Sequence, residues 1–264
     1  MVFTSELIPY KTLVINGTPN SKGLFNQYSG GGSFSVSLTG ANVTNKSSVS
    51  VKVCIASATI PLTYYGINTN NNTLSFTEGA VVCTATIAPG NYTSTSISAA
   101  VQAAMNAASV NAISYTVTLS TNNGRVTFAS SSAIVNTTIS VTLSTAIQPL
   151  GLGTTALAAF NATTPLTVPN IANLIGPTEV HIRCANFVTD IYESQIQTPS
   201  TIMAVVPIVG NQFDSLIYQP AIAKQFSDVS GKIDSLSFNI TDEFGQTINF
   251  NGYGVKLTLA LFEV

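Results

Sequence analysis

Charged side chains are scarce in this chain. Only 8% of its 264 residues are Asp, Glu, Lys or Arg, whereas ordinary soluble domains carry roughly 25%. The net charge of −2 provides no basic surface for nucleic-acid phosphates, so direct nucleic-acid binding is not expected. Two explanations fit the low charge: a β-rich protein built from Ser and Thr strands needs few charges, or permanent interfaces cover much of the surface and exclude them. We favour the second explanation.

Histidine occurs once and cysteine three times, which leaves few groups for catalysis or metal binding. The odd number and wide spacing of Cys54, Cys83 and Cys184 predict buried thiols rather than disulfides, and zinc ligands at the usual spacing are missing. His181 lies in an apparent strand, a setting typical of a polar residue on a solvent or interface face rather than of a catalytic base. We therefore predict no catalytic, cofactor-binding or metal site, and expect a protein that is not an enzyme.

Long apolar runs are missing too. No stretch approaches the roughly 20 apolar residues of a membrane-spanning helix, and residues 1–11 lack the basic start and apolar run of a secretory signal. We therefore expect no membrane-spanning segment and synthesis in the cytoplasm. Asp228 and the pair Asp242-Glu243 lack the alternating pattern of a calcium loop, which favours turn capping instead. Three glycines at 30–32 lack the Gly-Lys-Ser/Thr of a phosphate loop.

Alternation of apolar and polar side chains is frequent in the chain and most regular near its end. The pattern predicts strands at 232–242 and 254–264. Each strand would bury one face, and the apolar residues on those faces are Ile233, Leu236, Phe238 and Ile240 in the first, and Val255, Leu257, Leu259 and Leu261 in the second. We expect the two to form a long antiparallel strand pair joined by a decorated connection.

Further strand patterns precede these two. They lie at 33–38, 49–60, 73–87 as one strand broken near Glu78-Gly79, 179–188, 201–207 and 216–222. With the terminal strands this makes about eight, separated by turns of Gly, Pro, Asn and Asp. That number is typical of a jelly roll, so the predicted fold class is all-β, a single eight-stranded jelly roll formed by two antiparallel sheets.

One segment departs from the strand rhythm. Residues 94–108 carry an apolar stripe at helical spacing, formed by Ile97, Val101, Ala104 and Met105, with Thr93 or Ser94 as the helix N-cap. A hairpin follows at 114–128, turning at 121–124, and its Tyr115, Val117, Val126 and Phe128 are expected to pack on the helix. A further strand is predicted at 138–143. Residues 88–170 are therefore predicted to form a small inserted α/β subdomain, while 33–87 and 171–264 form the jelly roll.

Residues 1–32 show little periodicity and end in a Ser-Gly-rich run. We predict an N-terminal arm that gains order on a partner or along the domain edge.

Four segments together resemble a known family. They are 60–68 (IPLTYYGIN) before an Asn-rich turn, 89–93 (PGNYT) at the helix entry, 150–153 (LGLG), and 242–245 (DEFG) followed by Asn251-Gly252 before the last strand. In order and spacing they are similar to the jelly-roll penton, or minor capsid, proteins of virophages, polinton-like viruses and related icosahedral double-stranded DNA viruses. The resemblance extends over roughly residues 34–264.

The resemblance implies a virion protein at the five-fold vertices of the capsid. Five copies would form a homopentamer through lateral heterologous contacts, next to capsomers of the major capsid protein, with a vertex fibre as a further candidate partner. The arm would face the capsid interior or reach towards neighbouring capsomers, and the insert, with Tyr92 and the tip at Asn122-Asn123-Gly124, would be displayed outwards. An alternative stays open: a receptor-binding fibre head or a lectin-like jelly-roll module.

Overall fold

The computed structural model describes residues 11–17, 25–29, 32–38, 51–187, 200–220, 227–229 and 235–263. The chain separates into two compact units. We call Met1–Tyr64 with Pro177–Val264 the jelly-roll unit, and Tyr65–Gly176 the inserted unit. In the described residues strands dominate, and no helix has both the length and the apolar character needed to cross a bilayer.

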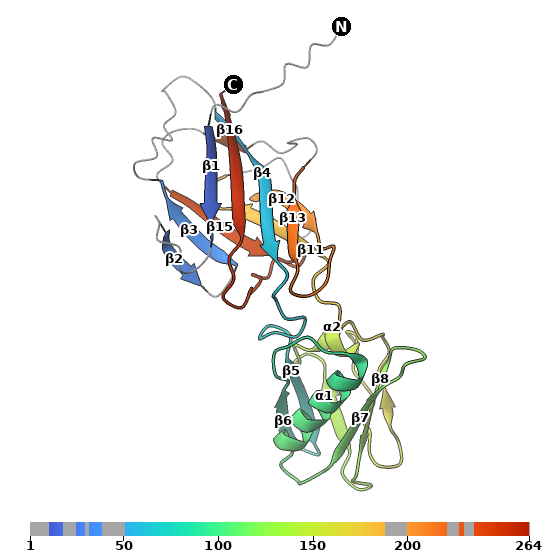
Figure 1. Cartoon of the computed structure of the whole chain (residues 1–264). Helices are drawn as coiled ribbons and strands as arrows, with labels where there is room; N and C mark the ends of the chain where they lie inside the picture. The colour runs from blue at the N-terminus through green and yellow to red at the C-terminus, as the bar shows by residue number, and fades with distance from the viewer. Residues whose placement is uncertain are drawn as a thin grey trace. The chain divides into compact units, whose positions relative to one another are not determined.

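The jelly-roll unit is built from two antiparallel sheets (Figure 1). Its strands are β1 (Lys11–Asn16), β2 (Phe25–Ser29), β3 (Ser33–Ser37), β4 (Val51–Pro61), β11 (Glu179–Cys184), β12 (Ile202–Pro207), β13 (Ser215–Tyr218), β14 (Ser227–Val229), β15 (Ser235–Thr241) and β16 (Lys256–Glu263). The first sheet has the order β1-β16-β4-β13, with β14 also pairing with β4, and the second has the order β12-β11-β15-β3-β2.

The strand pairs of this unit are nested. The first strand pairs with the last, β1 with β16, and moving inwards β3 pairs with β15, β4 with β13 and β14, and β11 with β12. A chain that pairs from its ends towards its middle forms one long hairpin, and rolling that hairpin into two facing sheets gives a jelly roll. The predicted fold class is therefore confirmed, and the inserted unit interrupts the chain between β4 and β11.

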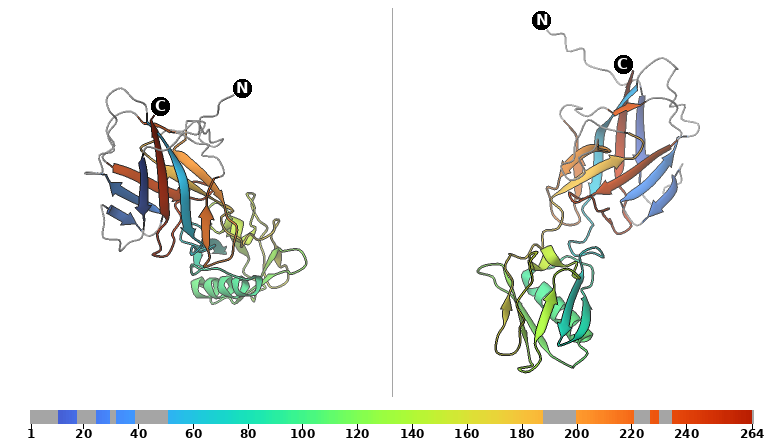
Figure 2. Two further views of the ribbon diagram at one scale, coloured as in Figure 1. Left: turned by 45° about the horizontal axis from the view of Figure 1, so that its top comes forward. Right: turned by 180° about the vertical axis from the view of Figure 1, so that it is seen from behind.

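Both sheets contribute alternate residues to one core, as the period of a strand requires. Phe34 and Phe238 stack across paired strands of the second sheet with ring centroids 5.3 Å apart, and the buried Leu257, Leu259 and Leu261 line the facing side of the first. Figure 2 shows the two sheets of this unit from two further directions. The buried faces predicted for the two terminal strands are confirmed at every described position.

The predicted pairing of these terminal strands is wrong. β15 pairs with β11 and β3, whereas β16 pairs with β1 and β4 in the other sheet. Alternation specifies which face of a strand is buried but not which strand lies beside it. The connection after β15 folds back on itself through an isolated bridge between Thr241 and Thr247, and it carries the chain from one sheet to the other.

The described residues of 1–32, predicted to form an N-terminal arm, contain the strands β1 and β2. β1 lies at one edge of the first sheet and β2 at one edge of the second, so both are strands of the jelly-roll unit. Gly32 sits where a Cβ would come within 2.4 Å of the carbonyl oxygen of Ile248, so only glycine fits there. The remaining residues of this segment lie outside the described part of the chain.

The inserted unit has a core of its own. It contains β5 (Thr73–Glu78), β6 (Val81–Thr86), α1 (Ser94–Ala108), β7 (Tyr115–Leu119), β8 (Val126–Ser130), β9 (Thr137–Ser140), α2 (Ile147–Leu150) and β10 (Leu166–Thr167). Two antiparallel sheets, β6-β5-β9 and β10-β8-β7, share the core with α1. Ile97, Val101 and Met105 of the helix are buried, and the predicted N-cap Thr93 forms a capping box with Ser96.

The boundaries of this unit differ from the predicted 88–170. β5 and β6, predicted as one broken jelly-roll strand, form a hairpin that turns at Gly79 and packs into the core of the inserted unit. The alternation of a strand identifies its buried face but does not indicate which core that face joins. The sequence pattern therefore predicts β5 and β6 in the wrong unit.

Candidate functional site

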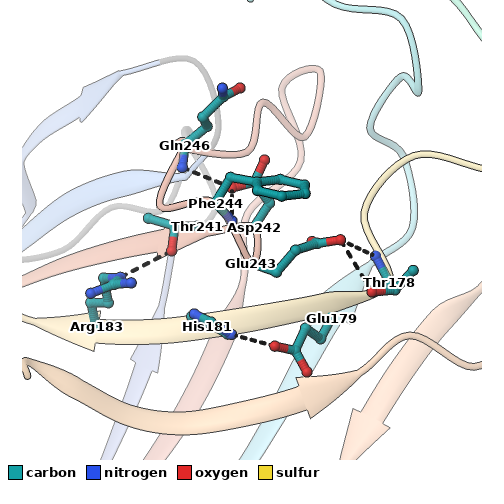
Figure 3. Close-up of polar contacts among 9 residues, drawn as sticks. All are labelled: Thr178, Glu179, His181, Arg183, Thr241, Asp242, Glu243, Phe244 and Gln246. Carbon is teal, nitrogen blue, oxygen red and sulfur yellow. Dashed lines mark hydrogen bonds and ion pairs between the residues drawn. The ribbon is translucent and has the colours of Figure 1, made fainter. Parts of the chain in front are cut away.

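His181 and its neighbours form a polar cluster on the outer face of the second jelly-roll sheet. β11 turns Val180, Ile182 and Cys184 into the core, so the alternate residues Glu179, His181 and Arg183 lie on the opposite face. The imidazole Nε2 of His181 is 2.7 Å from Oε1 of Glu179 (Figure 3). The predicted placement on an outward face holds, yet His181 is only 8% exposed.

The rest of the cluster ties the β15–β16 connection to this sheet. Nε of Arg183 donates to Oγ1 of Thr241 at 3.0 Å, and the backbone N–H and hydroxyl of Thr178 donate to Oε1 of Glu243 at 3.2 and 3.1 Å (Figure 3). These bonds join strand β11 and the segment before it to the residues that follow β15.

Asp242 caps the turn of that connection, as predicted. Its Oδ1 accepts hydrogen bonds from the backbone N–H groups of Phe244 at 2.9 Å and Gln246 at 2.8 Å (Figure 3). Burial raises the pKa of Asp242, and the neighbouring Glu243 adds to the rise, while the two backbone donors oppose it. For Asp228, the side chain lies outside what the structure describes.

Within the described residues, the hydrogen bonds of this cluster hold the β15–β16 connection against β11. In that part of the chain His181 is bonded to Glu179 alone, and its Nδ1, like Oε2 of Glu243, is buried without a hydrogen-bond partner. Over the described ranges, no three His, Cys, Asp or Glu side chains gather closely enough to hold a metal ion. The geometry thus gives His181 a carboxylate neighbour.

A second polar cluster lies inside the inserted unit, and the sequence did not predict it. Glu78 is 2% exposed; its Oε1 accepts from the hydroxyl of Tyr115 at 2.9 Å and its Oε2 from the backbone N–H of Asn111 at 2.8 Å. The Tyr115 hydroxyl also lies 3.1 Å from that of Thr137. The one signal that points to Glu78 is its isolation as the sole carboxylate in Tyr65–Gly176.

Hydrogen bonds keep this buried carboxylate ionised. Burial by itself raises the pKa of Glu78, but the donors from Ser109, Asn111, Tyr115 and Val110 outweigh it, so the pKa lies below the ordinary value of 4.5. Burial, with the adjoining carboxylate, raises the pKa of Tyr115, which therefore remains a hydrogen-bond donor. The cluster holds the end of β5 against the segment after α1.

The three cysteines are buried and free, as predicted. Burial raises the pKa of each thiol, and that of Cys184 reaches about 11. At neutral pH they are therefore thiols rather than nucleophilic thiolates.

Apolar side chains stand exposed on the jelly-roll unit. Val14 of β1 is 79% exposed and Ile217 of β13 is 69% exposed, and these strands lie at opposite edges of the first sheet. Phe213, before β13, is 75% exposed and has a positive φ of 73°, which is uncommon for a bulky residue. Its backbone N–H donates to the carbonyl of Leu62, and the Leu62 N–H donates to that of Asp214, so the loop is held in place.

The four segments that carry the family resemblance lie mostly in the connections between strands and helices. Thr63, in the first, donates its hydroxyl to the carbonyl of Phe250, and Asn251 donates its side-chain amide to the carbonyl of Thr63, each at 2.6 Å. The first and last segments, nearly 190 residues apart in the chain, therefore meet at one corner of the jelly-roll unit. Gly151, in the third, adopts a φ of 68°.

Comparison with solved structures finds a distant structural likeness. No protein-family profile matches the chain, and no curated protein matches its sequence. The crystal structure of the selenomethionine-labelled mavirus penton protein aligns over 96% of this chain and 99% of its own, with a TM-score of 0.43 and 7% sequence identity. The likeness is a distant one and concerns the backbone alone.

Proposed function

We propose that this chain is a structural capsid protein, the penton at the five-fold vertices of an icosahedral double-stranded DNA virus of the virophage or polinton-like kind. It assembles as a homopentamer and contacts the neighbouring capsomers of the major capsid protein. The observation that carries the proposal is a jelly roll with exposed apolar side chains on both edge strands of one sheet, in a chain that has few charges.

The physical argument starts from ring closure. Copies related by rotation about one axis join two different surfaces, one from each neighbour. β1 with Val14 and β13 with Ile217 are two such surfaces at opposite edges of the first sheet. Permanent interfaces bury upwards of about 2,000 Å² and are apolar at their centres, so a subunit made for such contacts gains from carrying few charges.

The two polar clusters support a structural role in this proposal. The His181 cluster fixes the connection that crosses between the sheets, and the Glu78 cluster fixes the end of a strand. Both serve the rigidity that a capsid subunit requires. The family resemblance of the turn segments points to the same role.

An electron cryomicroscopy reconstruction of virus particles that contain this chain tests the proposal. The expected result is five copies of the jelly roll around each five-fold axis, with the major capsid protein beside them. Density for this chain away from the vertices, or its absence from intact particles, contradicts the proposal.

A further inference from the structure

The inserted unit has a single exposed charge. Of the twenty charged residues in the chain, only Glu78 and Arg125 fall within Tyr65–Gly176. Glu78 is buried and Arg125 is exposed, and every residue of this unit is described. The exterior of the inserted unit therefore carries one positive charge and no negative charge.

Arg125 lies on the outer face of the β10-β8-β7 sheet. The backbone N–H of Ser120 donates to the carbonyl of Arg125 at 3.0 Å, which extends the β7–β8 ladder by one residue pair. Val126 is buried and Thr127 is not. Because side chains alternate along a strand, Arg125 shares the outer face with Thr127.

Three threonines form a row across that face. Thr118 of β7 pairs with Thr127 of β8, and Thr127 pairs with Thr167 of β10. Neighbouring strands lie about 4.8 Å apart, so the row spans roughly 10 Å. The hydroxyls of Thr127 and Thr167 are 2.9 Å apart; only one of their two hydrogens lies in that bond, so the other is available to a ligand.

The backbone beneath Arg125 is fixed. Its N–H donates to Oδ1 of Asn123 at 3.0 Å, and the carbonyl of Gly124 accepts from the N–H of Ala172 at 2.8 Å. A Cβ on Gly124, which has a φ of 65°, would come within 2.8 Å of Cγ2 of Ile171. The turn therefore needs glycine, and it presents the guanidinium from a rigid support.

The other sheet of the unit provides the contrast. Its outer face also carries hydroxyls, among them those of the exposed Thr84 and Thr86 of β6. No exposed charged residue accompanies them on that sheet. Exposed hydroxyl groups therefore occur on the outer faces of both sheets. The guanidinium distinguishes the β10-β8-β7 face.

We propose that the outer face of β7, β8 and β10 binds a glycan that ends in a carboxylate-bearing sugar. The planar guanidinium of Arg125 pairs with the carboxylate, a geometry that favours two parallel hydrogen bonds. The row of Thr118, Thr127 and Thr167 donates to and accepts from the sugar hydroxyls. No carboxylate on the exterior of this unit repels the ligand. This binding goes beyond the proposed capsid role and does not depend on it.

Isothermal titration and saturation-transfer NMR of the full chain test the assignment, with sialyllactose as the acidic probe and lactose as the neutral one. We expect saturable binding of sialyllactose and at least about tenfold weaker binding of lactose, because a charge-assisted hydrogen bond is lost. Arg125→Ala should weaken sialyllactose binding by a similar factor, and Arg125→Lys should restore only part of it. Thr84→Val, on the other sheet, should bind like the unaltered chain.

Four outcomes overturn the assignment. They are the absence of saturable sialyllactose binding, equal binding of lactose, retention of binding by Arg125→Ala, and equal binding of a sulfated lactose, which would show attraction to any anion. Circular dichroism of each variant confirms that the fold is intact. Thr127→Val is a second variant for the same face, and unchanged binding by it removes the threonine row from the site.

Discussion

The two units of this chain differ in where they place ionisable side chains and in how fully these side chains are hydrogen-bonded. The inserted unit keeps its only carboxylate, Glu78, inside and gives both of its oxygens hydrogen bonds. The jelly-roll unit places its Glu179, His181 and Glu243 on the outer side of a sheet, where Nδ1 of His181 and Oε2 of Glu243 have no partner. The difference teaches that a full set of donors lets a carboxylate be buried and ionised without a cation.

A second contrast concerns the exteriors. The jelly-roll unit carries eighteen of the twenty charged residues and also the exposed Val14 and Ile217. The inserted unit presents one guanidinium together with hydroxyls, amides and exposed apolar side chains such as Ile134 and Ile175. The two units therefore differ in charge, whereas exposed apolar side chains occur on both.

The largest expected effect separates the two cores. Phe238→Ala should destabilise the jelly-roll unit by about 3–5 kcal/mol, and Phe128→Ala should destabilise the inserted unit by a similar amount, because each ring is fully buried. Denaturant unfolding followed by hydrogen exchange should show that each variant loses stability only in the unit that carries the substitution. A loss shared equally by both units would mean that the two cores unfold as one.

The buried carboxylate comes next. Glu78→Ala should cost about 2–3 kcal/mol, because it leaves the Tyr115 hydroxyl and the Asn111 N–H without their acceptor. Glu179→Ala is the matched change in the other unit and should cost less than about 1 kcal/mol, since that side chain is 38% exposed. Urea unfolding measures both, and equal costs would break the contrast between the clusters.

Acid should act on the same carboxylate. The pKa of Glu78 is lower in the folded chain than its ordinary value of 4.5, so its ionised form contributes stability that is present above pH 4.5 and is lost as the pH falls through the folded-state pKa. Glu78→Gln should flatten this part of the stability curve of the inserted unit. An unchanged acid dependence in the variant would place its source elsewhere.

Two glycines with similar φ, 64° at Gly79 and 68° at Gly151, sharpen the account of the turns. Gly151→Ala should cost about 2 kcal/mol or more, because its Cβ would come within 2.4 Å of the carbonyl oxygen of Asn170. Gly79→Ala should cost only about 1 kcal/mol, since nothing lies within 4 Å of its Cβ. Melting temperatures of the two variants give the comparison, and the reverse order would refute the packing argument.

The smallest effect concerns the helix start. Thr93→Ala should cost about 1 kcal/mol because the N–H of Ser96 loses its acceptor. Ser94→Ala, one residue later, is the control and should cost a few tenths of a kcal/mol at most. Thermal unfolding distinguishes them, and equal stability of the two variants would remove Thr93 from the cap.

The sequence predicted what depends on local periodicity. The buried faces of β15 and β16, the extent of α1 and the inward residues of the β7–β8 hairpin all follow from alternation or helical spacing, and the structure has them. Local periodicity does not indicate which strands pair, because a strand with one apolar face can bury that face beside any neighbour that shares its core. For the same reason β5 and β6 were assigned to the jelly roll.

The two polar clusters could not be predicted from local sequence patterns. Glu78 and Tyr115 lie 37 positions apart, and Tyr115 had the alternation of an ordinary core residue. His181 could be placed on an outward face from its strand, but its burial depends on packing that no local pattern encodes. Arg125 attracts notice only once the surrounding unit is known to have no other exposed charge.

Light scattering of the purified full chain, coupled to size exclusion, tests the central claim that copies of this chain cover the exposed apolar side chains at its sheet edges. The account predicts a closed oligomer of five copies that forms as concentration rises, and its loss in Ile217→Asp while Val82→Asp in the inserted unit leaves it intact. A chain that stays monomeric at high concentration and in high salt contradicts the account.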